Sequence, residues 1–278
     1  MNSRMTDKLI NFGTIIILLF VTIIFIFPIY WVFQLSIKPP QLNLVEPPAF
    51  IFTPTLEHYI YTFISPGKNL INLSSSIIVS TVATIVAFAF SFPASYAFSR
   101  FNFRYRNALL FWFLSLLLTP PIVFTIPYYI LMSNIGLRGT YVGLIIVYQT
   151  FAIPLTIWLL KSFIDAIPIE VEEAALIDGA DQRTILLRII LPICAPGAAV
   201  SMAFTFVFCW NNLIFPIILA EGQTRTLSLA TFEYFTITGA TWNYIATCSF
   251  INILPPLIIF LLLRRYIVRG LTFGAVKG

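Results

Sequence analysis

The sequence predicts an all-α, polytopic membrane protein with six transmembrane helices. Hydrophobic residues make up 59% of its 278 residues and charged residues only 10%, against roughly 25% charged residues in ordinary soluble domains. A bilayer core about 30 Å thick needs about 20 consecutive apolar residues per helix, and six runs of about this length occur in the chain. A soluble fold cannot hide so much apolar surface, so we expect a membrane bundle.

The six apolar runs define the predicted spans, and none of them contains Asp, Glu, Lys, Arg or His. The first run is too long for the core of a signal peptide and no small-residue cleavage site follows it, so we interpret it as a retained span. No segment between the runs is long enough for a soluble domain, so residues 1–278 are predicted to form a single transmembrane domain. The spans are predicted at residues 12–35, 71–98, 109–131, 141–160, 193–220 and 244–263.

The distribution of Lys and Arg predicts the orientation, because basic residues near span ends stay on the cytoplasmic side. Twelve of the 16 Lys and Arg residues lie in the N-terminus, the second and fourth connections and the C-terminus. Both termini, the connection 161–191 and the tail 264–278 are therefore predicted to be cytoplasmic. This bias also explains the net charge of +5, without a nucleic-acid partner.

The residue content of the spans argues against several chemistries. Proton-coupled carriers usually need an ionisable group within the membrane, and these spans have none, although sodium held by backbone carbonyls remains open. No GxxxxGK[ST] stretch is present to cradle a nucleotide. Cys194, Cys209 and Cys248 lie within spans without CxxC spacing or nearby His, so we expect packing residues rather than a metal site. The chain is predicted to be no enzyme and to hold no cofactor.

The connection 161–191 is predicted to form a helix-turn-helix. Pro168 stands at a plausible first helical position, and glutamates follow in the first turn, where the helix dipole favours negative charge. Gly179 supplies a C-terminal stop. Asp181 can cap a second helix that runs to Leu191-Pro192. The alternative is a solvated acidic loop that merely joins two spans.

The residue order in this connection resembles the signature loop of ABC-importer permeases. Glu173-Ala174-Ala175 is followed by Gly179 and later by Leu191-Pro192. Asp178, directly before the glycine, matches the carbohydrate-importer branch. On this resemblance the expected ATPase-coupling residues are Glu172, Glu173, Ala174, Ala175, Asp178, Gly179, Leu191 and Pro192.

Other stretches are similar to the same branch along nearly the whole chain. They are Pro93–Arg100, Trp210-Asn211-Asn212 and the tail 269–278, which looks like that of the smaller permease of maltose-type and polyol-type systems. Asn212 departs from the branch, which often has an acid there, so its role is left open. The tail residues expected to dock on the ATPase by this resemblance are Thr272, Gly274, Lys277 and Gly278.

The resemblance implies a type I ABC importer permease fold for residues 1–278, in the inner, cytoplasmic membrane of a prokaryote. It implies a heterodimer with a second six-span permease, two ATPase subunits that bind ATP and Mg²⁺, and an extracytoplasmic solute-binding protein. The solute would be a sugar, an oligosaccharide or a polyol. Alternatives are an ABC importer permease for another solute, a sodium-coupled carrier working alone, and a non-transporting membrane scaffold or receptor.

Polar and aromatic side chains of spans three to six are candidates for lining a solute pathway. Aromatic rings and amides suit neutral hydroxylated ligands by stacking and hydrogen bonding. The same residue types also serve as interfacial belts or hold helices together. The candidates are Tyr128, Tyr148, Gln149, Trp210, Asn211, Asn212 and Asn252.

Overall fold

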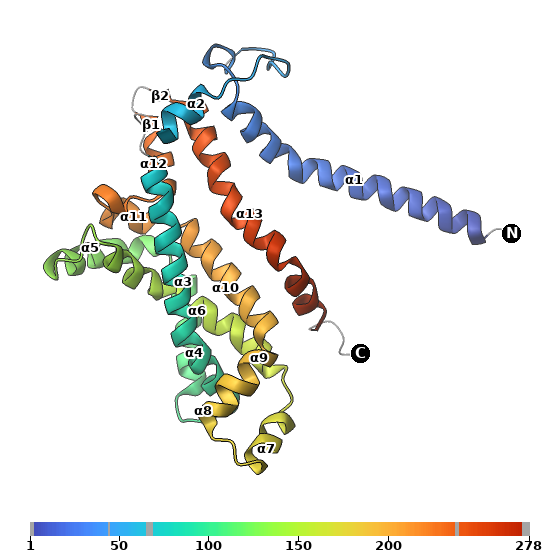
Figure 1. Cartoon of the computed structure of the whole chain (residues 1–278), viewed down its shortest axis with the longest axis vertical. Coiled ribbons are helices and arrows are strands. Elements are labelled where there is room, and N and C mark those ends of the chain that lie inside the picture. The colour runs from blue at the N-terminus through green and yellow to red at the C-terminus, as the bar shows by residue number, and fades with distance from the viewer. Residues whose placement is uncertain (1–2, 44, 65–68, 237–238, 274–278) are drawn as a thin grey trace. The chain divides into compact units, whose positions relative to one another are not determined.

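The computed structural model describes residues 3–43, 45–64, 69–236 and 239–273, with side chains for 13–43, 45–64, 69–235 and 241–266. Its regular structure is nearly all helical (Figure 1). Two strands of two residues each, β1 (Phe235–Thr236) and β2 (Gly239–Ala240), pair antiparallel. The prediction of an all-α membrane protein is confirmed.

Among the residues that the structure describes, four helices are long and apolar enough to cross a membrane, and the number rises to six if each of two bent helix pairs crosses as one span. The four are α1 (Ser3–Ser36), α3 (Asn69–Arg100), α6 (Tyr141–Asp165) and α13 (Trp242–Phe273). Since α6 continues to Asp165, the predicted connection at 161–191 begins inside this helix. The third predicted span falls within one bent pair, Arg106–Leu118 with Pro121–Asn134, and the fifth overlaps the other, Gln182–Ile193 with Ala195–Trp210.

Two successive prolines account for the first bend. The predicted span 109–131 consists of α4 (Arg106–Leu118), η3 (Pro121–Phe124) and α5 (Thr125–Asn134), with a 96° bend at Pro120-Pro121. A proline lacks the backbone N–H and its ring clashes with the preceding turn, so two in succession end a helix.

The fifth predicted span, 193–220, is interrupted twice. A 79° bend separates the preceding helical segment from α10 (Ala195–Trp210). The chain then breaks at residues 211–213 before α11 (Ile214–Leu219).

The remaining helical elements are short. They are η1 (Pro40–Leu42), α2 (Glu57–Tyr59), η2 (Ile60–Ile64), α7 (Glu170–Ile177), α8 (Gln182–Thr184), η4 (Ile185–Ile190), α9 (Leu191–Ile193), η5 (Gly222–Thr224) and α12 (Leu227–Glu233).

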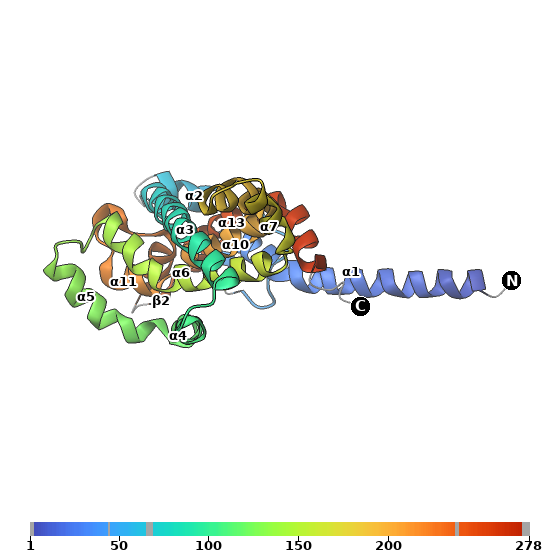
Figure 2. The ribbon, with the colours of Figure 1, turned by 90° about the horizontal axis from the view of Figure 1, so that it is seen from below.

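The chain divides into two compact units. Unit 1 comprises Met1–Asn69 and Thr231–Ile253, and unit 2 comprises Leu70–Ala230 and Leu254–Gly278. That the whole chain works as one domain stays a prediction. In unit 2, α7, α8 and α9 lie together beyond the end of α3 (Figure 1), and α4 and α5 follow one another along one side (Figure 2).

The core of unit 2 is built on α6. Leu144, Val147 and Phe151 of α6 are buried against residues of α3 and α11. The α6–α10 contact is close, because the hydroxyls of Thr156 and Thr205 are hydrogen-bonded at 2.7 Å. A second apolar cluster buries the inner faces of α7 and η4 against α3 and α6. The loop from Ala166 to Leu191, called the α7 loop below, packs on this second cluster.

Candidate functional site

The α7 helix ends where the sequence predicts a stop. Gly179 adopts a φ of +83°, a conformation that glycine takes without a steric penalty. The N–H groups of Gly179 and Ala180 donate to the carbonyls of Leu176 and Ala175, both at 3.0 Å. This pair of bonds is the Schellman motif, which satisfies the last carbonyls of a helix. The glycine therefore fixes the direction in which the chain leaves α7.

The second helix of the loop begins at Asp181. Its carboxylate accepts a hydrogen bond from the Thr184 N–H at 2.9 Å. Hydrogen bonding from Thr184 lowers the pKa of Asp181 below its ordinary value, because it stabilises the charged form. The segment that follows is not one regular helix: α8 passes into the π-helix η4 and then α9.

The inner face of α7 is buried in the chain's own core. Ala175 is 8% exposed and Glu172 only 5% exposed. Ala175 packs in the second apolar cluster with Tyr96 and Ile167. The side chains of both residues are therefore occupied within this chain, and their part in ATPase coupling stays a prediction.

The outer face of α7 and the turn after it carry four of the other predicted coupling residues, and Leu191 and Pro192 lie in α9. Glu173, Ala174, Asp178 and Gly179 are exposed, as is Pro192, whereas Leu191 is half-buried. Sequence reasoning missed the most prominent member of this face. Ile177 is 87% exposed and its neighbour Leu176 is 49% exposed. Two adjacent exposed apolar side chains therefore lie beside the acidic groups of this face.

A polar network beneath α7 holds Glu172 in place. The Arg100 Nε donates to Glu172 Oε1 at 2.5 Å, and its Nη2 donates to the carbonyls of Ile164 at 3.1 Å and Ile167 at 2.8 Å. The Tyr96 hydroxyl donates to Glu172 Oε2 at 2.7 Å and lies 3.2 Å from Gln182 Oε1. The network joins α3, α6, α7 and α8.

Sequence reasoning did not single out Tyr96 or Arg100 as site residues. They end a stretch that was noted only as similar to the carbohydrate-importer branch. Their spacing of four residues places both on one face of α3. That spacing is the signal that could have found them.

The predicted docking residues of the tail lie outside the described side chains. Thr272 belongs to α13 by its backbone. Gly274, Lys277 and Gly278 lie outside the described residues. Their role stays a prediction.

A pocket of about 570 Å³ in unit 2, called the broken-helix pocket below, lies at the helix breaks at Pro120-Pro121 and at residues 211–213. Asn211 and Asn212 are its polar residues. Asn212 Oδ1 also accepts from the Phe215 N–H at 3.2 Å, so this side chain caps the start of α11. Interrupted helices place backbone polar groups beside a cavity, the arrangement found at solute sites of transporters. The other lining residues are Pro121, Leu155, Phe204, Val207, Phe208, Leu213 and Ile214.

The other predicted pathway residues do not line this pocket. Tyr148 and Trp210 are each 1% exposed and pack against Phe215 and Phe206 respectively. In this structure they are core residues, which corrects their assignment. The remaining three are partly buried: Tyr128 is hydrogen-bonded to Thr150, Gln149 donates to the Ala83 and Ile145 carbonyls, and Asn252 lies in unit 1.

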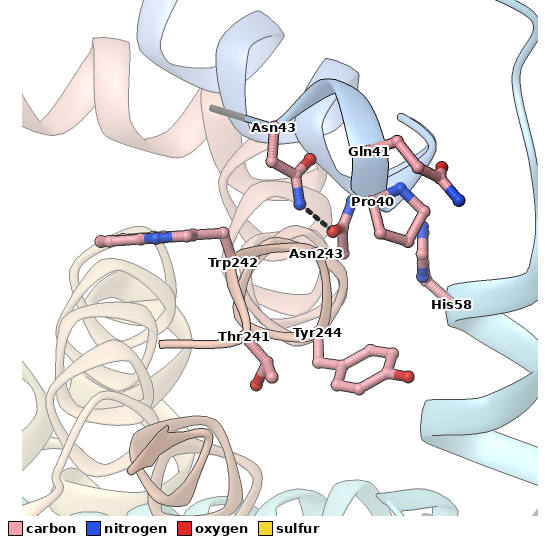
Figure 3. A pocket seen from close by; sticks show the side chains of 8 residues that line it. All are labelled: Pro40, Gln41, Asn43, His58, Thr241, Trp242, Asn243 and Tyr244. Atoms are coloured by element: carbon pink, nitrogen blue, oxygen red, sulfur yellow. Dashed lines mark hydrogen bonds between the residues drawn. The ribbon is translucent and has the colours of Figure 1, made fainter. Parts of the chain in front are cut away.

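Unit 1 has a pocket of its own, of about 460 Å³, beside the start of α13 (Figure 3). Asn243, one of its lining residues, accepts from Asn43 and donates to the carbonyls of Leu35 and Lys38. Trp242, 43% exposed, and Tyr244 project from α13 in opposite directions (Figure 3). Amides and aromatic rings dominate the lining.

Comparison with known proteins decides the family. Residues 89–268 match the family described as the binding-protein-dependent transport system inner membrane component. The chain belongs to this family. The match contains the whole α7 loop and the broken-helix pocket, and the resemblance to ABC-importer permeases is confirmed. As a member of this family, the chain is a multi-pass membrane component of a transport system.

Relatives of this family member include two sugar permeases. The diacetylchitobiose uptake system permease protein DasC of Streptomyces coelicolor is 33% identical and covers 91% of this chain and 92% of its own length. The trehalose/maltose transport system permease protein MalG of Thermococcus litoralis is 30% identical over 92% of this chain and 93% of its own.

The fold of this family member is also found among solved structures. A chain of a bacterial ABC transporter involved in the import of the acidic polysaccharide alginate superposes with a TM-score of 0.74 at 17% identity. The match covers 94% of this chain and 97% of that chain. It supports the type I importer fold.

Proposed function

We propose that the chain is the transmembrane permease subunit of an ATP-driven, binding-protein-dependent importer for a sugar, an oligosaccharide or a polyol. The observation that carries this proposal is the α7 loop, whose inner face is tied to the spans while its outer face presents Glu173, Ile177 and Asp178 to a partner. Family membership and the two sugar-permease relatives support the transport role and the solute class.

The partners in this proposal are a second six-span permease, two ATPase subunits and an extracytoplasmic binding protein. The ATPase subunits bind ATP and Mg²⁺ and hydrolyse the nucleotide, and this chain contributes no catalytic group. The membrane is the inner membrane of a prokaryote, with both termini and the α7 loop cytoplasmic, as the bias of Lys and Arg indicates. The tail from Thr272 to Gly278 is a second docking element for the ATPase.

The outer face of α7 acts in this proposal by packing against the ATPase. Ile177 is a large apolar side chain that water surrounds in the isolated chain, so burying it in a partner's groove gains hydrophobic stabilisation. Glu173 and Asp178 supply charged contacts at the margin. Ala174 is small enough to permit close approach.

Copurification in mild detergent tests this function. The chain is expected to bring down an ATPase and a second six-span protein. When this complex is reconstituted into lipid vesicles, the vesicles are expected to take up trehalose, maltose or diacetylchitobiose only with ATP. Ile177→Glu should weaken ATPase attachment by about tenfold or more, because a buried apolar anchor becomes a desolvated charge.

The matched control is Ile51→Glu. Ile51 is 97% exposed in the loop predicted to lie on the opposite side of the membrane, so this change should leave ATPase attachment intact. Uptake without ATP, or purification without any ATPase, would contradict the proposal. The first result indicates an ion-coupled carrier and the second a scaffold or receptor. ATP-driven uptake of only a non-carbohydrate solute would correct the solute class alone.

The broken-helix pocket is proposed as part of the solute pathway. Asn211 is exposed and lines the pocket, and its amide can donate to and accept from solute hydroxyls. Asn211→Leu is expected to reduce uptake about tenfold, the effect of a lost hydrogen bond at a desolvated site, while the ATPase stays attached.

The control for the pocket is Asn134→Leu. Asn134 is exposed at the end of α5 and does not line this pocket, so uptake should not change. Equal uptake by the Asn211→Leu and Asn134→Leu variants would remove the pocket from the pathway. It would leave the role of α7 untouched.

A further inference from the structure

We propose that Arg100 is a positioning residue that clamps α7 to α3 and α6, so that force on the outer face of α7 moves both spans with it. This inference rests on the proposed function, and it concerns a residue buried behind the outer face of α7.

One guanidinium contacts α7, α6 and the connection between them. Arg100 is the last residue of α3, and its donors reach Glu172 of α7 at 2.5 Å and the Ile164 carbonyl of α6 at 3.1 Å. A third donor contact, to the Ile167 carbonyl at 2.8 Å, holds the connection between α6 and α7. The planar, rigid fork of arginine suits such simultaneous contacts, whereas a lysine ammonium is a point charge on a flexible stem.

Burial makes the link persistent. The side chains of Arg100 and Glu172 are 10% and 7% exposed. In the part of the chain that the structure describes, the two other ion pairs are more open, with Arg138–Glu221 at 38% and 55% and Lys161–Asp165 at 17% and 43%. Separating a buried pair leaves an uncompensated charge in a dry site, so such a pair resists opening more than an exposed pair does.

A second attachment keeps α7 from pivoting about the clamp. The Tyr96 hydroxyl, one turn earlier on α3, donates to the other oxygen of Glu172 at 2.7 Å. Its ring belongs to the apolar cluster that contains Ala175. Glu172 is thus held through both oxygens, and α7 cannot rotate without breaking two contacts.

The residues of the clamp are different from those of the outer face of α7. Arg100 and Glu172 point into the chain, while Ile177 and Glu173 face outward. Weakening the clamp should leave the ATPase attached, yet make α7 move without its spans. The expected phenotype is ATP hydrolysis that no longer drives solute uptake.

The test uses the complete transporter in proteoliposomes, with uptake of trehalose, maltose or diacetylchitobiose measured per ATP hydrolysed. Glu172→Gln and Arg100→Lys are expected to lower this ratio about tenfold, the range of coupling changes from single sites, with ATPase attachment unchanged. The control is Lys161→Gln. Its pair with Asp165 lies within one helix, so its ratio should equal that of the original chain.

A second readout does not depend on the solute. Spin labels at the exposed positions Glu170 and Asn102 report the distance between α7 and the end of α3, with the three cysteines replaced by alanine. In the original chain this distance should be narrow and unchanged by ATP. In Glu172→Gln it should broaden and shift with ATP.

Three results would overturn the clamp. One is an unchanged uptake ratio and label distance in both clamp variants. Another is recovery of coupling in the swapped double variant Arg100→Glu/Glu172→Arg, which restores the charges but not the two carbonyl contacts. If Glu172→Gln fails to accumulate, Tyr96→Phe replaces it, and an unchanged ratio there also counts against the clamp. Failure of the proposed function looks different, since the original chain itself would then bring down no ATPase.

Discussion

A valine at position 179 is expected to abolish ATP-driven uptake while the chain still inserts into the membrane. The φ of Gly179 is +83° and no atom lies within 4 Å of where a Cβ would stand. The effect of a substitution is therefore one of backbone strain, about 1–2 kcal/mol for an ordinary L-residue and more for a β-branched one. The chain would relieve this strain by leaving α7 in another direction, and the outer face would be misplaced.

A graded series at position 179 separates strain from bulk. Asparagine enters this backbone region more readily than other residues, so uptake should fall in the order Gly, Asn, Ala, Val. Uptake and ATPase copurification are measured for each variant. Activity that follows side-chain size instead of this order would show that the glycine provides space for the partner rather than a turn.

Gly136→Val is the matched control for the series. Gly136 has a φ of +69° and no atom within 4 Å of its Cβ position, but it lies between α5 and α6, away from the α7 loop. The same strain should lower stability there without selectively removing ATPase attachment. Equal loss of attachment in both variants would contradict a specific role for the α7 turn.

Leucine at position 197 is expected to prevent correct packing of α10 on α6. A Cβ at Gly197 would lie 2.3 Å from Phe163 Cγ and 2.6 Å from its Cβ, closer than atoms can approach. Alanine alone should destabilise the protein by about 1–3 kcal/mol, the range for overpacking, and leucine by more. Thermal unfolding of the purified chain measures the loss.

A double-mutant cycle checks the assigned cause. Phe163→Ala removes the colliding ring, so the Gly197→Ala/Phe163→Ala variant should lose less stability than the sum of the two single variants. Additive losses would show that the close approach is not the reason. Gly13→Ala is the control, because nothing lies within 4 Å of that Cβ position and alanine favours helix.

Several features followed from the sequence because local chemistry determines them. The apolar runs predicted the spans, since each must cover the bilayer core. The stop at Gly179 and the cap at Asp181 depend on a few neighbouring backbone groups. The double proline at 120–121 indicates a kink within the predicted span 109–131, and the structure shows the size of that bend, 96°.

Other features depended on neighbours distant in sequence. Tyr148 and Trp210 have the composition of pathway residues, but Phe215 and Phe206 cover them. The break at residues 211–213 carries no proline within it, and the pocket beside it forms only where a second broken helix contributes Pro121. Composition could not distinguish Asn211 and Asn212, which line the pocket, from Tyr148 and Trp210, which are buried.

The α7 loop shows most clearly which features the sequence determines and which depend on the tertiary structure. The sequence by itself determined that a multi-pass membrane protein carries a short acidic helix closed by a glycine. It could not tell Glu172 from Glu173, which are identical in chemistry and adjacent in the chain. Successive helical residues point about 100° apart, so only one of them can face the buried Arg100. The tertiary structure decided which glutamate holds the helix and which one is left for a partner.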